Sequence, residues 1–197
     1  MPRVSAEHKL GRREEILDAA RACFARSGYQ GATLQDIFAA AGLSAGCVYS
    51  YFQSKQDLVL AIAEARHAEE RDALAVEESD PILALKTIAR RFVQGYLAGG
   101  AEEKRRISLA TWSEAMFNDA VLASVRAGVD GPRKALAALV ARAQASGALR
   151  KDIDGEALAR VMTAMLQGLV LQKLWDAETD ARAMTLVCEQ LIDALCA

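Results

Sequence analysis

Apolar residues recur along this chain at the three- and four-residue spacing of amphipathic helices. Between residues 7 and 27, Ile16, Ala20 and Phe24 share one helical face, and Gly28 stands where that helix should stop. No segment shows the strict alternation of apolar and polar residues that predicts a half-buried strand. The pattern therefore predicts an all-α fold.

Capping signals divide the rest of the chain into further helices. Asp80 precedes Pro81, which is an N-cap followed by proline at the first helical position. The sequence leaves open whether the helix over 119–146 continues, kinks or breaks at Asp130-Gly131-Pro132. In total the chain is expected to have about nine helices. The expected N-caps of the last three are Asn118 or Asp119, then Asp154, and then Thr179 or Asp180. The expected ranges are 55–78, 81–100, 102–117, 119–146, 155–175 and 180–196.

The segment from Thr33 to Leu58 predicts three capped helices within 26 residues. Two short helices joined by a turn containing glycine form a helix-turn-helix unit, whose second helix enters the major groove of DNA. An ordinary corner between two helices of an all-α domain is the alternative. The start and stop signals are Thr33 with Asp36, Gly42, Ser44, and Ser54 with Asp57.

The residue content of the second short helix favours DNA binding over a purely structural role. With Val48 facing inward and about 100° per residue, Gly46, Cys47, Tyr49 and Ser50 point outward. The flanking residues Ser44, Ala45, Tyr51 and Phe52 fall on or beside the buried side. A glycine lets the backbone approach DNA, and a tyrosine offers a hydroxyl to a phosphate. Because the outward face has no Arg, Lys, Asn or Gln, we expect weak direct base readout. Sequence specificity should then depend on contacts with thymine methyl groups, on one or two hydroxyl groups and on DNA shape.

Residues Ile16 to Ile62 resemble the TetR family of bacterial transcriptional regulators. The resemblance rests on Phe24, Gly28, Thr33, Ile37, Ala41-Gly42, Tyr49, Phe52, Lys55 and Leu58 in family spacing. Phe38 departs from the pattern, since many relatives have alanine there, and a larger ring is expected to shift how the two helices cross. The resemblance implies DNA contacts by Thr33, Gln35, Ser44, Ala45, Gly46, Tyr49, Ser50, Tyr51 and Lys55. For Lys55, both its charge and the amides at the start of its helix suit a phosphate.

The same resemblance implies two domains. A helix-turn-helix DNA-binding domain would span residues 1–54, and an effector-binding and dimerisation domain residues 55–197, with a shared helix at the boundary. In proteins similar to this one, the last two helices form a four-helix bundle with their copies in a homodimer. Core packing is the alternative explanation for their apolar stripes, whose members are Leu158, Val161, Leu169, Met184, Val187, Leu191 and Leu195.

A small-molecule effector site is expected among the middle helices if the family pattern applies. An apolar or aromatic ligand would suit the aromatic and sulfur-containing residues gathered there, although each of them also suits a plain core. From Trp112 onward the chain resembles the C-terminal domains of choline-responsive and related regulators of the family. The candidates, centred on Trp112, are Phe92, Tyr96, Trp112, Met116, Phe117, Met162 and Met165.

Charge and composition add a basic N-terminal arm and a cellular location. The formal net charge is −2, but residues 1–13 carry four basic side chains and one acidic one. That arm either follows DNA phosphates and the minor groove or is a solvated tail. No apolar run approaches the ~20 residues of a membrane span, and the polar N-terminus lacks a signal-peptide core. The sequence therefore predicts a cytoplasmic protein that does not enter the membrane.

Little in the sequence supports an enzyme or a cofactor. The chain has two histidines, and the element Glu64-x-x-His67 lacks the second copy that a di-iron bundle needs. The four cysteines form no metal-ligand pair, so no metal and no cofactor are expected. Cys23 and Cys188 are expected in the core, while a redox role for Cys47 stays open.

The sequence thus predicts a sequence-specific transcriptional regulator: a ligand-responsive repressor that binds a palindromic operator in double-stranded DNA as a homodimer. A non-regulatory, architectural DNA-binding protein is the alternative, and a helical-bundle enzyme is less well supported.

Overall fold

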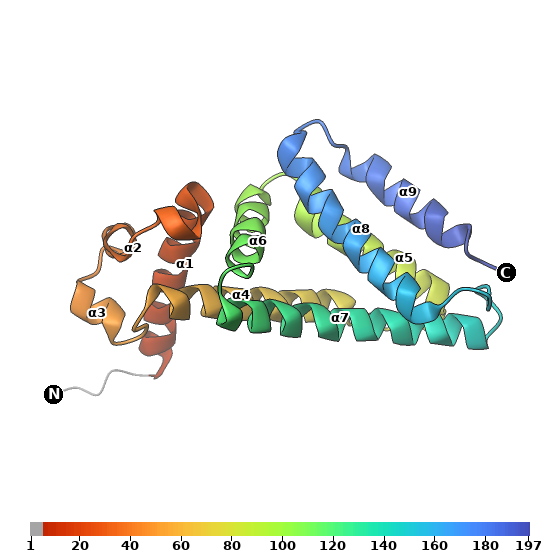
Figure 1. Cartoon of the computed structure of the whole chain (residues 1–197), viewed down its shortest axis with the longest axis horizontal. Helices are drawn as coiled ribbons and strands as arrows, with labels where there is room; N and C mark the ends of the chain where they lie inside the picture. The colour runs from red at the N-terminus through yellow and green to blue at the C-terminus, as the bar shows by residue number, and fades with distance from the viewer. Residues whose placement is uncertain (1–5) are drawn as a thin grey trace. The chain divides into compact units, whose positions relative to one another are not determined.

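The structure, a computed structural model, describes residues 6–197, and for residues 6, 70, 73 and 74 only the backbone. Within that range nine α-helices account for nearly all regular structure, and the one β feature is an isolated antiparallel bridge between Leu149 and Cys196. The all-α fold is therefore confirmed. The helices are α1 (Ala6–Gly31), α2 (Leu34–Ala41), α3 (Ala45–Tyr49), α4 (Lys55–Leu74), α5 (Pro81–Leu97), α6 (Glu102–Glu114), α7 (Asp119–Ala145), α8 (Gly155–Trp175) and α9 (Ala181–Asp193) (Figure 1).

Aspartate and asparagine side chains begin the later helices as the sequence predicts. The carboxylate of Asp80 accepts hydrogen bonds from the backbone amides of Ile82 and Leu83, at 2.8 and 3.3 Å. Asp154 and Asp180 cap α8 and α9 in the same way. Of the two candidates before α7, it is Asn118 whose side-chain oxygen accepts from the helix amides. Each cap satisfies amides that have no partner within the helix.

Several helix ends differ from the sequence-based expectation. Gly28 takes a left-handed φ of 68°, which interrupts the helix where a stop is predicted, but helical turns resume as far as Gly31. The fourth helix ends at Leu74 instead of residue 78, and the sixth at Glu114 instead of residue 117. In the second case Asn118 caps α7 with its side-chain oxygen, so the sixth helix ends before that residue.

Helix α7 runs unbroken from Asp119 to Ala145 through Pro132. The proline removes one backbone hydrogen bond, which usually bends or breaks a helix. The guanidinium of Arg133 contacts Asp130 within α7 and Glu156 on α8, at 3.0 and 3.2 Å. These ion pairs tie the proline-containing turn to the next helix.

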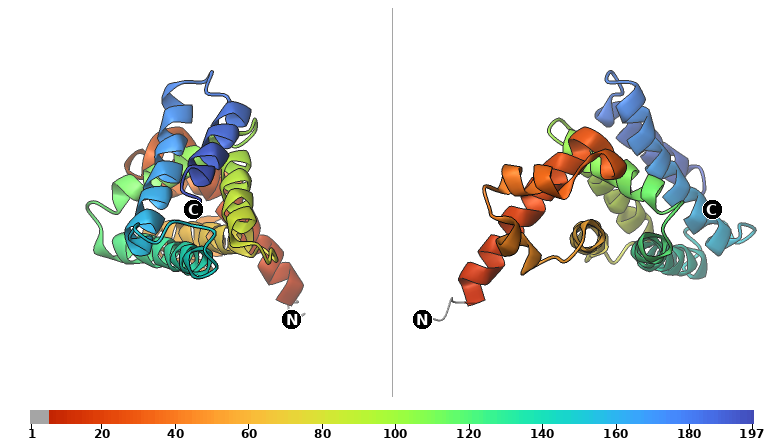
Figure 2. Two further views of the ribbon diagram at one scale, coloured as in Figure 1. Left: turned by 90° about the vertical axis from the view of Figure 1, so that its right-hand side faces the viewer. Right: turned by 60° about the vertical axis from the view of Figure 1, so that its left-hand side comes forward.

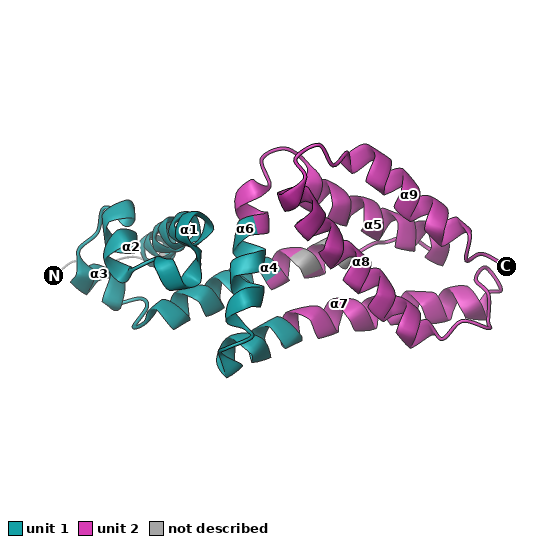
Figure 3. Cartoon of the chain, turned by 45° about the horizontal axis from the view of Figure 1, so that its top comes forward, with its two compact units in different colours: residues 1–66, 106–126 teal, residues 67–105, 127–197 magenta. Residues whose placement is uncertain are grey.

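The chain divides into two compact units (Figure 3). The first contains residues 1–66 and 106–126, and the second contains residues 67–105 and 127–197. The boundary expected at residue 55 does not coincide with this division, because α4, α6 and α7 each contribute to both units. Within the first unit, Ile107, Ala115 and Val121 pack into the same apolar cluster as the N-terminal helices.

The second unit is organised around α5. Helices α8 and α9 both pack against α5 but scarcely touch each other. The views in Figure 2 show the three helices running alongside one another. Two ion pairs join α5 to α9: Lys86 with Asp193, and Arg90 with Glu189 at 2.6 Å. None of the described helices combines the length and apolarity that crossing a membrane requires.

A close approach between α4 and α7 generates a stability prediction. A Cβ atom added at Gly128 would lie 1.9 Å from Nε2 of His67, whose side chain is buried. Because the imidazole has little room to move, Gly128→Ala should destabilise the fold by about 1–3 kcal/mol in urea unfolding, the usual cost of overpacking. The matched control is Gly95→Ala in α5, where an added Cβ meets nothing within 4 Å. It should stabilise by about 0.5–1 kcal/mol. Equal stability of the two variants would contradict the packing described.

Candidate DNA-binding surface and apolar groove

The two short helices α2 and α3 form the helix-turn-helix unit, and their caps have the predicted geometry. The amide of Asp36 donates to the Thr33 hydroxyl at 3.1 Å, and the amide of Thr33 donates to the Asp36 carboxylate at 2.9 Å. Hydrogen bonds from the Thr33 side chain and backbone lower the pKa of Asp36. Gly42 ends α2 with a left-handed φ of 65°, and the Ser44 hydroxyl accepts from the Cys47 amide. The capping box and both turn signals are confirmed.

Burial fixes which face of α3 is presented to solvent. Val48 is fully buried beneath α3 in the core of the first unit, and Phe52 lies in the same core. Gly46, Tyr49 and Ser50 are exposed, as predicted. Ala45, which helix geometry places on or beside the buried side, is exposed instead, because α3 is a single short turn and its first residue extends beyond the core. Cys47 is half-buried and therefore less outward than expected, while the remaining candidates Thr33, Gln35 and Ser44 are exposed and Tyr51 is half-buried.

Phe38 supports the exposed tyrosine of α3. The rings of Phe38 on α2 and Tyr49 on α3 meet edge to face with centroids 5.5 Å apart. An aromatic contact of this kind limits the directions in which the tyrosine hydroxyl can point. The residue that departs from the family pattern thus sets the orientation of a predicted DNA contact.

Lys55, predicted to bind phosphate, has its ammonium group hydrogen-bonded to protein carbonyls. Its Nζ donates to the backbone oxygens of Tyr29 and Ala32, at 2.8 and 3.1 Å. The same group lies 4.4 Å from the centre of the Tyr29 ring. Lys55 therefore fastens the start of α4 to the end of α1, where carbonyl groups lack helical partners. This positioning role and the phosphate contact expected from the sequence differ in the salt dependence of DNA binding that they predict.

A second contact joins the end of α1 to α6 within the first unit. The side-chain amide of Gln30 donates to the buried carboxylate of Glu114 at 2.9 Å, and Asn118 donates to the other oxygen. Burial, followed by the charge of Glu114, raises the pKa of Tyr29. The end of α1 is thus held by Lys55 of α4 and by Glu114 of α6. Of the predicted basic arm, residues 1–5 lie outside the described part of the chain, and Lys9, Arg12 and Arg13 lie on α1.

The seven effector candidates are divided between the two compact units. Trp112, Met116 and Phe117 belong to the first unit, where Arg66 lies over the Trp112 ring at 5.9 Å. Met116 and Phe117, which follow α6, are 77% and 83% exposed. In the second unit the rings of Phe92 and Tyr96 stack on each other at 4.6 Å. A site centred on Trp112 stays a prediction.

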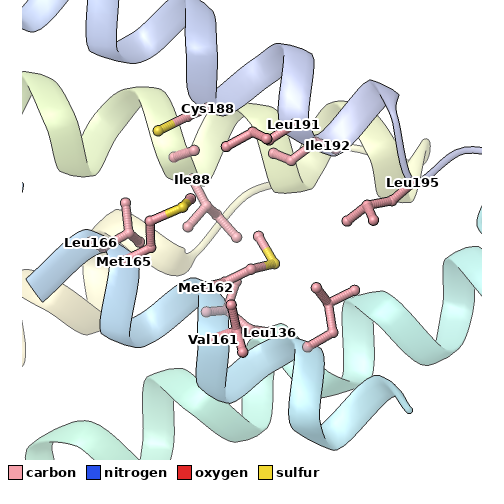
Figure 4. A pocket seen from close by; sticks show the side chains of 12 residues that line it. Ile88, Leu136, Val161, Met162, Met165, Leu166, Cys188, Leu191, Ile192 and Leu195 are labelled. Carbon is pink, nitrogen blue, oxygen red and sulfur yellow. The ribbon is translucent and has the colours of Figure 1, made fainter. Parts of the chain in front are cut away.

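Met162 and Met165, the other two effector candidates, line an apolar groove of about 230 Å³ in the second unit (Figure 4). The groove exists because α8 and α9 lie apart on α5, which forms the floor with Ile88 and Ala89. The wall from α8 consists of Leu158, Val161, Met162, Met165 and Leu166, beside which Leu136 comes from α7, and the opposite wall consists of Cys188, Leu191, Ile192 and Leu195. Sequence reasoning missed Ile88, Ala89, Leu136 and Ile192, because their pattern is that of any buried helix face.

The seven dimer candidates lie along α8 and α9, and several are exposed in the single chain. Val161, Val187 and Leu191 are 62%, 49% and 47% exposed, although valine and leucine are usually buried. The other members, Leu158, Leu169, Met184 and Leu195, are half-buried. Leu158, Val161, Leu191 and Leu195 also line the groove. The groove therefore opens on the face that the sequence predicts for dimerisation.

Comparison with known proteins assigns the chain to a family. Residues 16–62 match the model of the bacterial regulatory proteins of the tetR family, and residues 86–197 match that of the BetI-type transcriptional repressor, C-terminal. The second match alone covers more than half of the chain. The chain belongs to the TetR family. A TetR-family protein is a transcriptional regulator that binds DNA through the helix-turn-helix unit. The matched N-terminal segment contains the unit formed by α2 and α3.

Individual relatives share only part of the sequence of this TetR-family chain. Over 172 residues the chain is 27% identical to the HTH-type transcriptional repressor AcnR of Corynebacterium jeikeium, a match covering 86% of this chain and 85% of the relative. Over 63 residues it is 44% identical to the HTH-type transcriptional repressor Rv1474c of Mycobacterium tuberculosis, covering 32% and 34%. The chain thus spans only about a third of several curated relatives that it matches.

Solved structures share the fold of this TetR-family chain. A putative transcriptional regulator from Saccharomonospora viridis in complex with choline has a TM-score of 0.79 at 22% identity, covering 93% of this chain and 96% of the other. The fatty acid degradation regulator FadR from Bacillus halodurans has a TM-score of 0.81 at 20% identity, covering 92% and 94%.

The contacts of Lys55 predict that it acts by positioning and not by binding phosphate. Lys55→Ala should lower stability by about 1.5–3 kcal/mol, because it removes hydrogen bonds from a charged donor. It should also weaken operator binding, while the slope of log affinity against log salt stays unchanged. The control is Lys173→Ala, which removes similar ammonium–carbonyl bonds to Ala177 and Thr179 in the second unit. It should affect operator affinity less. A slope reduced by about one would assign Lys55 to a phosphate instead.

Proposed function

We propose that this TetR-family chain is a ligand-responsive repressor that binds a palindromic operator as a homodimer. The observation that carries the DNA-binding part is the presentation of α3: its buried side is anchored by Val48, and its other side offers Ala45, Gly46 and Tyr49 to solvent. Small residues at the start of a recognition helix allow its backbone to approach base edges in the major groove.

Repression is favoured by the curated relatives, and ligand response by the fold. Both AcnR and Rv1474c are described as repressors. The structural neighbour from Saccharomonospora viridis holds choline, and the BetI-type C-terminal match includes every residue that lines the groove. A ligand in that unit would favour one of two dimer states and thereby change operator affinity.

Dimerisation is favoured by the apolar surface of α8 and α9. Val161, Val187 and Leu191 would leave water if a second copy packed on this face. A dimer related by a two-fold axis would also place two recognition helices on half-sites about one helical turn apart, which matches a palindromic operator. An architectural protein would bind DNA without any response to a ligand, so a ligand-sensitive gel shift separates the two functions.

The Gly46 position tests the proposed DNA surface. Gly46→Glu should keep the fold, because a Cβ there meets nothing within 4 Å, but should weaken binding to DNA from upstream of the chain's own gene by about 100-fold or more. The cause is a carboxylate placed against phosphates. Gly95→Glu, at an equally open helical glycine of the second unit, is the control and should bind as the wild type does. Equal gel-shift affinities of the two variants would remove α3 from the interface.

Thymine methyl groups should contribute to recognition, because the outward face of α3 lacks the side chains that make bidentate base contacts. Replacing thymine by uracil in the operator removes the methyl group and leaves base pairing intact. Affinity should fall by about fourfold for each methyl group buried against Ala45 or Gly46, the usual value of one buried carbon. Fluorescence anisotropy with single-position uracil duplexes measures this effect. If complete substitution leaves affinity unchanged, readout through methyl groups is wrong.

The exposed stripe predicts how the dimer can be separated without unfolding the chain. Val187→Glu should fold, since the side chain is 49% exposed in the single chain, but should sediment as a monomer because a charge would be buried between copies. Operator binding should fall with it. Leu10→Glu, at a 66% exposed apolar position of α1, is the control and should remain dimeric. A wild-type protein that is monomeric at micromolar concentration and still binds a palindrome tightly would contradict the homodimer.

A further inference from the structure

The groove between α8 and α9 has an unusually uniform chemistry. Its described lining consists only of aliphatic, methionine and cysteine side chains, with no aromatic ring and no charged group among them. Burial raises the pKa of the Cys188 thiol, with a further contribution from Glu189, so the one ionisable group in the lining stays neutral. A surface of this kind offers dispersion and the hydrophobic effect, but no fixed partner for a charge.

Charged residues next to the groove are held in ion pairs between α5 and α9. Arg90 follows Ala89 of the floor and pairs with Glu189, which follows Cys188 of the wall. Asp193 follows Ile192 and pairs with Lys86. These four charges compensate each other at the helix pair that bounds the groove. The ion pairs therefore hold α9 on α5 and do not form a receptor for a charged ligand.

Recognition of a quaternary ammonium ion usually requires aromatic rings, and no aromatic ring belongs to the described lining of the groove. Such cations bind over the faces of aromatic rings, usually several arranged as a cage. In the second unit Phe92 and Tyr96 stack on each other, and the ammonium of Lys104 lies 4.5 Å from the centre of the Tyr96 ring. Neither ring lines the groove. A choline-like ligand would lose its hydration there and gain no compensating contact.

From these observations we infer that the groove binds a neutral aliphatic molecule and not a quaternary amine. Its volume of about 230 Å³ equals roughly eight water molecules at ~30 Å³ each, which suits a chain of about eight to ten carbon atoms. Ile88, Ala89 and Ile192 are at most 4% exposed, so the bottom of the groove reaches the interior of the unit. Enclosed apolar cavities stay dry and take small apolar guests, and the buried bottom of this groove offers an apolar surface of the same chemistry.

The inference rests on the proposed function and names the ligand class of its effector site. The mouth of the groove lies between Val161 and Leu191, which are the exposed members of the lining in the single chain. These two residues also belong to the predicted dimer face. An occupied groove therefore changes the surface on which the second copy packs, which gives the ligand a direct route to the dimer state.

A chain-length series of primary alcohols tests the inference on the full-length wild-type protein. Calorimetric titration from butanol to dodecanol should show affinity rising about fourfold per added methylene, as expected for buried apolar carbon. The rise should stop at a cut-off near eight to ten carbons. Choline and tetramethylammonium should show no binding at the same concentrations. Binding of choline as tight as that of octanol, or no binding of any alcohol, would overturn the proposal.

Two variants assign the binding to the groove by shifting the cut-off in opposite directions. Ala89→Leu adds three carbons to the floor and should shorten the cut-off by about three carbons. Met165→Ala removes three heavy atoms from the half-buried wall and should lengthen the cut-off by a similar number of carbons. If only one of the two variants folds, its shift alone still tests the proposal. Ala183→Leu, at an exposed position of α9 outside the lining, is the control. A cut-off unchanged in both groove variants would mean adsorption elsewhere and overturn the proposal.

The monomeric variant separates a small ligand from a second copy as the occupant. If Val187→Glu binds octanol and the wild-type dimer does not, then the partner's side chains fill the groove and the proposal is wrong. Operator binding by the ligand-free protein tests the proposed function separately. A protein that binds its operator but no alcohol refutes only the ligand class, whereas a protein that binds alcohol but no DNA refutes the proposed function.

Discussion

The burial of Val48 is the contact on which the DNA-binding surface depends. Helix α3 has five residues, far fewer than an isolated helix needs for stability in water. It persists because Val48 lies fully buried in the core of the first unit and because Ser44 caps its first turn. Everything that α3 presents to solvent follows from this one anchored side chain. A larger apolar face would bury more, but it would leave fewer exposed positions to meet DNA.

Local signals in the sequence were sufficient for the elements and insufficient for the sites. Thr33 with Asp36, Gly42 and Asp80 specify their turns through contacts within four residues, so their geometry can be predicted without knowing the fold. The acceptors of Lys55 lie at the end of α1 and in the turn after it, more than 20 residues away, and no local pattern predicts them. Its predicted role was inferred from its charge, from its place at the start of a helix and from the resemblance, while its observed contacts depend on how α1 and α4 pack.

The groove illustrates the same limit. Aromatic content pointed to a site around Trp112, but Phe92 and Tyr96 stack on each other, and Met116 and Phe117 remain exposed. The groove arises instead from the separation of α8 and α9 on α5, which is a property of helix packing. Its residues are indistinguishable from core residues in the sequence. Of its residues only Met162 and Met165 were predicted as effector contacts, whereas Leu158, Val161, Leu191 and Leu195 were predicted for the dimer face.

The central claim is that two copies of α3 read one palindrome, and a hydroxyl-radical footprint of the protein on DNA from upstream of its own gene tests it most directly. We expect two protected segments related by an inverted repeat, with their centres one or a small multiple of about 10 base pairs apart, on the same side of the duplex. A single protected segment, or uniform protection without a repeat, would contradict a dimeric helix-turn-helix regulator.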